Sequence, residues 1–96
     1  MKVTVQFGAP LSRIIGERKT ALTLAEGATV TDALDALRDR YPDFDAGLQG
    51  KGLRQPLDQV VYALFLNARP IPWERAAETL LRNGDRLSLF LPVAGG

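Results

Sequence analysis

Apolar and polar residues alternate at the beginning of the chain. Val3, Val5 and Phe7 alternate with polar side chains over residues 2–7, and this period of two predicts a strand with one face on a core. The same alternation returns over residues 20–24. We therefore expect two strands, paired as a hairpin.

The second half of the chain contains two further strand patterns. Residues 60–66 form an uninterrupted apolar run, which is typical of a strand in the middle of a sheet. Residues 86–91 alternate again. The short segment 71–73 contains a proline and is at best an edge strand. The sheet should therefore have four to five strands.

A helical period separates the two strand pairs. Apolar residues recur at offsets of four, seven and eleven from Val30, which predicts one amphipathic helix that covers one face of the sheet. Thr31 is expected to cap its N-terminus, and Pro42 to end it. The residues of this stripe are Val30, Leu34, Leu37 and Tyr41, with Ala33 beside them.

Shorter segments should connect these elements. Residues 11–16 are expected to form a helical turn that Gly16 closes in a left-handed conformation, and residues 44–48 a second turn. Residues 83–85 indicate a tight turn. Residues 74–81 are expected to hold one or two helical turns with three side chains facing inward: Ala77, Leu80 and Leu81.

Composition limits the chemistry of the chain. Its 96 residues suit a single domain, 1–96, and its net charge of +1 gives no field that would attract nucleic acid or a membrane surface. Cysteine and histidine are absent, so the usual nucleophile, general base and metal ligands are missing and no metal site is expected. The N-terminus reads neither as a signal peptide nor as a membrane span, and we expect a cytoplasmic protein.

The last residues have the properties of a flexible tail, 92–96. Pro92 cannot donate a hydrogen bond to a sheet, so pairing of the last strand should stop there. The four residues beyond it would reach about 13 Å. Because Gly95 and Gly96 have no Cβ, a narrow channel in another protein could close around their backbone.

The last strand should also present an aromatic ring. If Leu87, Leu89 and Leu91 face the core, alternation places Phe90 on the opposite face, where it could anchor a partner. The alternative is that Trp73 or the long loop covers it. Either Phe65 or Tyr62 should join it, since the two lie on opposite faces of their strand.

Four stretches of the chain resemble the MoaD/ThiS family of sulfur carriers, and most closely its molybdopterin synthase small subunits. These are the helix entry Leu24–Leu34, the pair Leu66–Asn67, the turn Leu80–Asp85 and the ending Leu89–Gly96. The family often has a second proline where this chain has Leu91. The resemblance implies an α+β, ubiquitin-like β-grasp fold with a mixed sheet and one main helix on one face.

The resemblance also implies a chemistry. An E1-like (MoeB-like) enzyme, using ATP and magnesium, would adenylate Gly96, and sulfur from a cysteine desulfurase or rhodanese would convert it to a thiocarboxylate. The preceding residues Pro92, Val93, Ala94 and Gly95 would thread into the partner, while Phe65, Phe90 and Leu91 would dock on it. A MoaE-like large subunit would then accept the sulfur for molybdopterin. The chain itself would bind no cofactor and would not be an enzyme alone.

Other functions remain open at this stage. The thiocarboxylate could serve thiamine, tRNA or amino-acid sulfur transfer, or the chain could modify protein lysines. A third hypothesis is a β-grasp interaction module that binds through its sheet. Arg69, Arg82 and Arg86 are expected to be solvated, with contact to acidic groups of a partner as the alternative.

Overall fold

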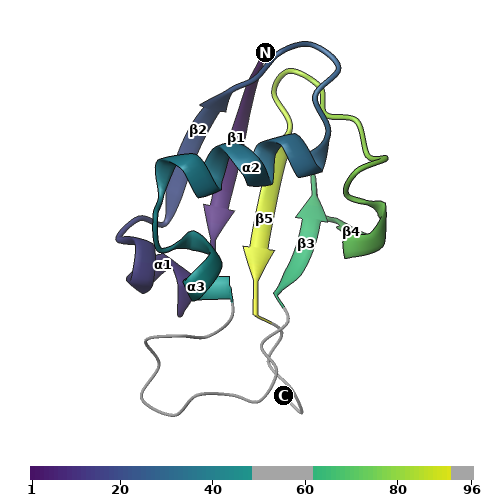
Figure 1. Cartoon of the computed structure of the whole chain (residues 1–96). Helices are drawn as coiled ribbons and strands as arrows, with labels where there is room; N and C mark the ends of the chain where they lie inside the picture. The colour runs from purple at the N-terminus through teal and green to yellow at the C-terminus, as the bar shows by residue number, and fades with distance from the viewer. Residues whose placement is uncertain (49–61, 92–96) are drawn as a thin grey trace.

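A computed structural model describes residues 1–48 and 62–91 of the chain. Figure 1 shows a twisted sheet with a helix lying across one face. The elements, in chain order, are β1 (Lys2–Phe7), α1 (Leu11–Ile15), β2 (Lys19–Thr23), α2 (Val30–Arg40), α3 (Phe44–Leu48), β3 (Ala63–Leu66), β4 (Arg69–Ile71), the 3-10 helix η1 (Trp73–Arg75) and β5 (Arg86–Phe90). The α+β class is as predicted, and the five strands agree with the four to five expected, but the edge strand β4 covers Arg69–Ile71 and not the expected 71–73.

The sheet is mixed, with the strand order β2-β1-β5-β3-β4. β1 and β5 are parallel, whereas the other neighbours are antiparallel. The prediction that the apolar run 60–66 lies mid-sheet needs correction, because within the described residues only 63–66 form a strand and β5 occupies the centre. β3 is still an interior strand, since β5 and β4 flank it. β5 is central because it pairs with strands from both halves of the chain.

The core lies between the sheet and α2. The predicted inward residues of β1 are buried, and the stripe of α2 faces them: the core includes Val3, Val5, Phe7, Leu22, Val30, Ala33, Leu34, Leu37, Phe44, Leu64, Leu87 and Leu89. Since burial of a large aliphatic side chain stabilises by about 1.5–3 kcal/mol, this layer is the main source of stability. β5 is anchored in this layer through Leu87 and Leu89, both fully buried.

The N-terminal cap of α2 is Thr29, and the prediction of Thr31 was wrong. Thr29 has an extended backbone, with φ −104° and ψ 174°, whereas Thr31 already lies inside the helix. The Thr29 hydroxyl accepts a hydrogen bond from the Asp32 amide, and the Asp32 carboxylate accepts one from the Thr29 amide. This reciprocal pair is a capping box, and it begins the helix two residues earlier than expected.

The segment that follows β4 also differs from its prediction. Helical structure is limited to η1, and Ala76 is buried in place of Ala77. From Thr79 the backbone pairs with the entry to α2: the Val30 amide donates to Thr79, and the Leu81 amide donates to Ala28. An extended backbone alternates its side chains, so Leu81 is buried whereas Leu80 is 64% exposed.

The short connecting elements agree with the sequence. α1 ends at Gly16, whose φ is +84°, and α3 forms at the predicted turn. Gly84 closes the turn before β5 with φ +89°.

None of the helices in the described ranges is long and apolar enough to cross a membrane.

Candidate functional site

The central strand β5 leads directly to the predicted tail. Leu91 is the last residue that the structure describes, and the expected threading residues Pro92, Val93, Ala94, Gly95 and Gly96 lie outside the described residues. β1 and β3 pair with β5 on its two sides. In Figure 1 the end of β5 lies at the same end of the molecule as α1, and the N-terminus lies at the other. The candidate site is therefore the surface around Phe90.

The side chains of β5 alternate as predicted. Leu87 and Leu89 are fully buried, whereas Phe90 is 40% exposed on the face away from α2. Trp73 does not cover the ring, and most of the long loop, the other candidate cover, lies outside the described residues. Trp73 instead donates its indole N–H to the carbonyl oxygen of Tyr62 at 2.6 Å, on the β4 side of the sheet.

Phe65, and not Tyr62, joins Phe90. The ring centroids of Phe65 and Phe90 are 6.3 Å apart with an interplanar angle of 47°. Tyr62 is buried in the core, because it lies three residues before Phe65 and therefore on the other face of the strand. The pair forms a half-exposed aromatic surface next to the point where the chain leaves the sheet.

Small residues flank the Phe90 ring on both neighbouring strands. Ala63 is the register partner of Phe90 on β3. On the other side, the Gly8 amide donates to the Leu89 carbonyl at 2.8 Å. A Cβ added to Gly8 would lie 2.5 Å from Cδ1 of Phe90, so the ring occupies space that a side chain would need.

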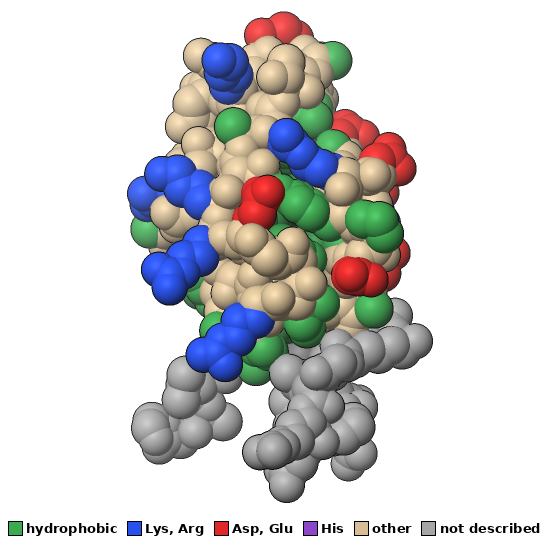
Figure 2. All heavy atoms as spheres, turned by 90° about the vertical axis from the view of Figure 1, so that its left-hand side faces the viewer, with side chains coloured by type: hydrophobic (Ala, Val, Ile, Leu, Met, Phe, Trp, Pro, Cys, Tyr) green, Lys and Arg blue, Asp and Glu red, His purple; other side chains and the backbone are tan. Residues whose placement is uncertain are grey.

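The face of the sheet that is turned away from α2 carries positive charge. None of the described strands contains an aspartate or glutamate. Alternation along β1, β2 and β5, together with the pairing register, places Lys2, Lys19 and Arg86 on the outer face of the sheet, the face away from α2. Figure 2 shows lysine and arginine side chains along one side of the molecule and most of the acidic side chains along the other. A partner that meets the outer face should present carboxylates.

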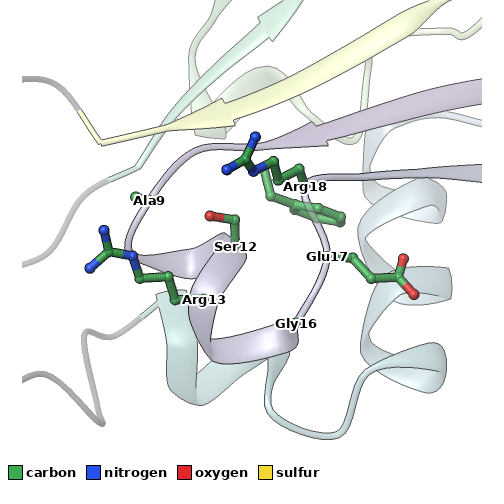
Figure 3. A pocket seen from close by; sticks show the side chains of 7 residues that line it. Ala9, Ser12, Arg13, Gly16, Glu17 and Arg18 are labelled. Carbon is green, nitrogen blue, oxygen red and sulfur yellow. The ribbon is translucent and has the colours of Figure 1, made fainter.

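A cleft beside the end of β5 adds two arginines. It has a volume of about 470 Å³ and lies inside the connection from β1 to β2. Figure 3 shows Ser12, Arg13 and Arg18 around it, with Glu17 turned away from both arginines. Within residues 1–48 and 62–91, the ion pairs are those of Arg38 and Arg75, so neither Arg13 nor Arg18 has an acidic partner there.

Tyr41, which follows α2, binds Glu17 on the side of the β1–β2 connection that faces away from Arg13 and Arg18. Its hydroxyl donates to the Glu17 carboxylate at 2.6 Å. Burial raises the pKa of Tyr41, and the hydrogen bond to Glu17 raises it further. The sequence predicted the helical turn α1 but not this cleft, because the cleft forms only when β1, α1 and β2 are folded together.

No grouping of three aspartate, glutamate, cysteine or histidine side chains in the described parts of the chain could hold a metal ion. The described residues of the candidate site offer partly exposed aromatic rings and cationic side chains, which are groups that protein interfaces commonly use. A mixed sheet with a helix across one face, and with the chain leaving from its central strand, is the architecture of ubiquitin-like β-grasp proteins.

Comparison with known proteins places the chain within this class. The sequence model of the ThiS family matches residues 5–96, and the chain belongs to that family. It is a family of ubiquitin-like sulfur carriers and modifiers.

Individual relatives span the whole chain. Small archaeal modifier protein 3 of Haloferax volcanii is 28% identical over 96 residues, covering 100% of both chains. The crystal structure of small archaeal modifier protein 1 from the same organism has a TM-score of 0.75 at 27% identity, with 100% of both chains covered.

Two further similar structures are of molybdopterin converting factors. A putative molybdopterin converting factor subunit 1 from Pyrococcus furiosus has a TM-score of 0.73 at 26% identity, covering 97% of this chain and 99% of that one. A complex of subunits 1 and 2 of the molybdopterin-converting factor from Helicobacter pylori matches with a TM-score of 0.54 at 29% identity, with 100% of both chains covered.

Proposed function

We propose that this protein is a sulfur carrier of molybdopterin biosynthesis. The observation that carries the proposal is a half-exposed aromatic pair: Phe90 lies on β5, the strand that leads into the Gly-Gly ending, and Phe65 lies beside it on β3. Membership of the ThiS family supports it, as does the likeness to two structures of molybdopterin converting factors, one of subunit 1 and one a complex of subunits 1 and 2.

The reaction would take place at Gly96. A carboxylate resists nucleophilic attack, so it needs a leaving group. An E1-like enzyme with ATP and magnesium would supply one: the carboxylate oxygen attacks the α-phosphorus, pyrophosphate leaves, and an acyl-adenylate forms. A persulfide sulfur from the donor protein then attacks the acyl carbon and AMP leaves. Cleavage of the resulting acyl disulfide by a second thiol leaves the thiocarboxylate.

The described residues would dock the carrier on its partners. Burial of Phe90 and Phe65 against an apolar surface would supply affinity, and aromatic residues of this kind commonly dominate such interfaces. Lys2, Lys19 and Arg86 on the same face would select a partner surface that carries carboxylates and would accelerate association. Leu91, the last described residue, would begin the threaded segment.

Mass spectrometry tests the carrier proposal. The chain is incubated with an E1-like enzyme, ATP, magnesium and a persulfide donor, and we expect a mass increase that matches replacement of one oxygen by sulfur. Gly96→Ala should fold normally but should not be adenylated, because a methyl group has no room in a channel built for glycine. Ala94→Gly is the matched control and should still react. Adenylation of Gly96→Ala at the normal rate would contradict the proposal.

A second assay tests the pathway. Mixed with a MoaE-like large subunit and a cyclic pterin precursor, the thiocarboxylate form should lose its sulfur to the pterin. The likeness to two small archaeal modifier proteins supports one alternative, conjugation to protein lysines. Lysine-linked adducts without sulfur transfer would favour that alternative.

A further pair of variants distinguishes a carrier from an interaction module. Removal of Gly95 and Gly96 should abolish sulfur transfer by a carrier. If the sheet alone carried the function, that truncation would be harmless and Phe90→Ala would abolish binding.

A further inference from the structure

A second apolar surface lies at the other end of the sheet. Leu80 and Phe90 are the large hydrophobic side chains most exposed in the described residues, and Leu80, at 64%, is the more exposed of the two. Leu80 borders a cleft of about 430 Å³, whose apolar walls include Leu66 and Ile71. Full burial of a leucine contributes about 1.5–3 kcal/mol, so contact at this position would be favourable.

The backbone fixes the outward direction of Leu80. Thr29 and Leu80 form a β-bridge, and the Leu81 amide donates to the Ala28 carbonyl. Leu81 fills the core beside α2, and alternation then turns Leu80 outward. A polar side chain could occupy this exposed extended position equally well, so the core does not require a leucine there.

The rim of this cleft is cationic. Arg69 and Arg82 line it and are exposed, and among residues 1–48 and 62–91 neither forms an ion pair. Asp85 also lines the cleft, and its carboxylate accepts hydrogen bonds from the Asn67 side-chain amide and from the Arg82 backbone amide, both at 2.8 Å. These bonds hold the carboxylate against the turn but leave its charge in place, so the lining carries two guanidinium groups and one carboxylate, a net charge of +1.

We propose that this cleft, lined by Leu66, Ile71, Leu80, Arg69 and Arg82, docks an acidic segment of a partner protein that inserts an aliphatic side chain between carboxylates. The aliphatic group would cover Leu80, and the carboxylates would pair with the two arginines. This inference is independent of sulfur transfer, since it uses no residue of the tail.

A partner in this cleft would leave the C-terminal end of β5 free for a second partner. The cleft lies at the start of β5, beside Asp85, whereas the chain leaves the sheet at Leu91. The six residue steps from Asp85 to Leu91, at about 3.4 Å each, separate the two ends by about 20 Å. One protein could hold the carrier through the Leu80 cleft while another acts on the C-terminus.

An NMR titration tests the proposal. The probe is an acetylated, amidated peptide of alternating aspartate and leucine, added to the full chain with labelled methyl groups. We expect saturable, salt-sensitive shifts of the methyl signals of Leu66, Ile71 and Leu80. A peptide with serine in place of leucine, and one with lysine in place of aspartate, should bind at least about tenfold more weakly.

Variants locate the binding. Leu80→Ala and Arg82→Ala should each weaken the peptide about tenfold, whereas Arg75→Ala, an exposed arginine outside the cleft, should not. Changing both Arg69 and Arg82 to glutamate should transfer the preference to the lysine peptide, which distinguishes a lost interaction from a damaged fold.

Three results would overturn the proposal. The first is binding that is absent at millimolar peptide or unaffected by Leu80→Ala. The second is a set of shifts centred on Phe90 and Phe65. The third is movement of the Leu80 signals with protein concentration alone, which would identify a second copy of this chain as the occupant.

Discussion

Gly8 and Phe90 are in direct contact across the parallel pair β1 and β5, and the aromatic ring lies where a side chain of residue 8 would be. A Cβ on Gly8 would be 2.5 Å from Cδ1 of the ring and 3.3 Å from Cα of Phe90. The glycine therefore sets the direction of the ring, and with it the shape of the surface next to the tail.

Gly8→Ala should displace the Phe90 ring and weaken docking of the E1-like partner. The added methyl group should also lower the free energy of unfolding by about 1–3 kcal/mol, the usual cost of overpacking. NMR contacts between the rings of Phe65 and Phe90 would report the displacement, and calorimetry the affinity. In a Phe90→Ala background the same change should cost less. An equal cost in both backgrounds would show that Gly8 does not act through the ring.

Phe90→Ala should raise the dissociation constant for the E1-like partner about tenfold or more, because an aromatic anchor is lost. The free energy of unfolding should change by less than about 1.5 kcal/mol, since the ring is partly exposed. Leu80→Ala is the matched control, because it removes the other large exposed apolar side chain and should leave this affinity unchanged. Surface plasmon resonance with immobilised enzyme measures both. Equal losses in the two variants would argue against a specific Phe90 interface.

Thr29→Ala should lower the free energy of unfolding by about 1 kcal/mol, because it removes the hydroxyl that caps α2. Thr31→Ala should change it by less than about 0.5 kcal/mol, since Thr31 is an ordinary residue of the first turn. Urea denaturation of the two variants side by side tests the assignment. A larger loss for Thr31 would restore the cap expected from the sequence.

Ala68→Gly should stabilise the protein. Asn67 and Ala68 connect β3 to β4 as a two-residue turn, and both have positive φ, 52° and 71°. Alanine is strained in that region whereas glycine is not, and Asn-Gly is the favoured pair in such hairpins. We expect a gain of about 0.5–1 kcal/mol in the free energy of unfolding, measured in urea. A loss would mean that the greater entropy of the unfolded glycine chain dominates.

Alkaline pH should destabilise the fold in part through Tyr41. Its pKa is raised above the ordinary value of 10.0 by burial and by the hydrogen bond to Glu17. A group with a raised pKa in the folded state binds its proton more tightly there, so its contribution is complete below the unfolded pKa and is lost as pH rises through the folded pKa. The urea midpoint should therefore fall as the pH rises above 10.0, and less steeply in Tyr41→Phe. Identical slopes would exclude a role for Tyr41.

Elements with a strong local period could be predicted from the sequence. β1 has the same bounds in the structure as in the alternation, and the stripe from Val30 to Leu37 faces the core. Predictions that depended on packing were less successful. Residues 74–81 carry helix-forming residues, but backbone pairing with Ala28 and Val30 extends the chain and exposes Leu80.

The exposed position of Phe90 in the candidate site could be predicted in the same way, but its neighbours could not. The outward direction of Phe90 followed from alternation, because each strand residue points opposite to its neighbour. Its neighbours did not follow. Gly8 precedes Phe90 by more than eighty residues in the sequence, and only the parallel pairing of β1 with β5 brings them together.

The sequence by itself determined the class of the fold, the family and the inward side of the strands that alternate, because periodicity and short motifs are local. The tertiary structure decided that β5 is central, that Phe65 and not Tyr62 lies beside Phe90, and that Leu80 meets Arg69 and Arg82 at the other end of the sheet. The physical reason is that strand order and register are set by the packing of the whole core, which brings together residues that no short stretch of sequence connects.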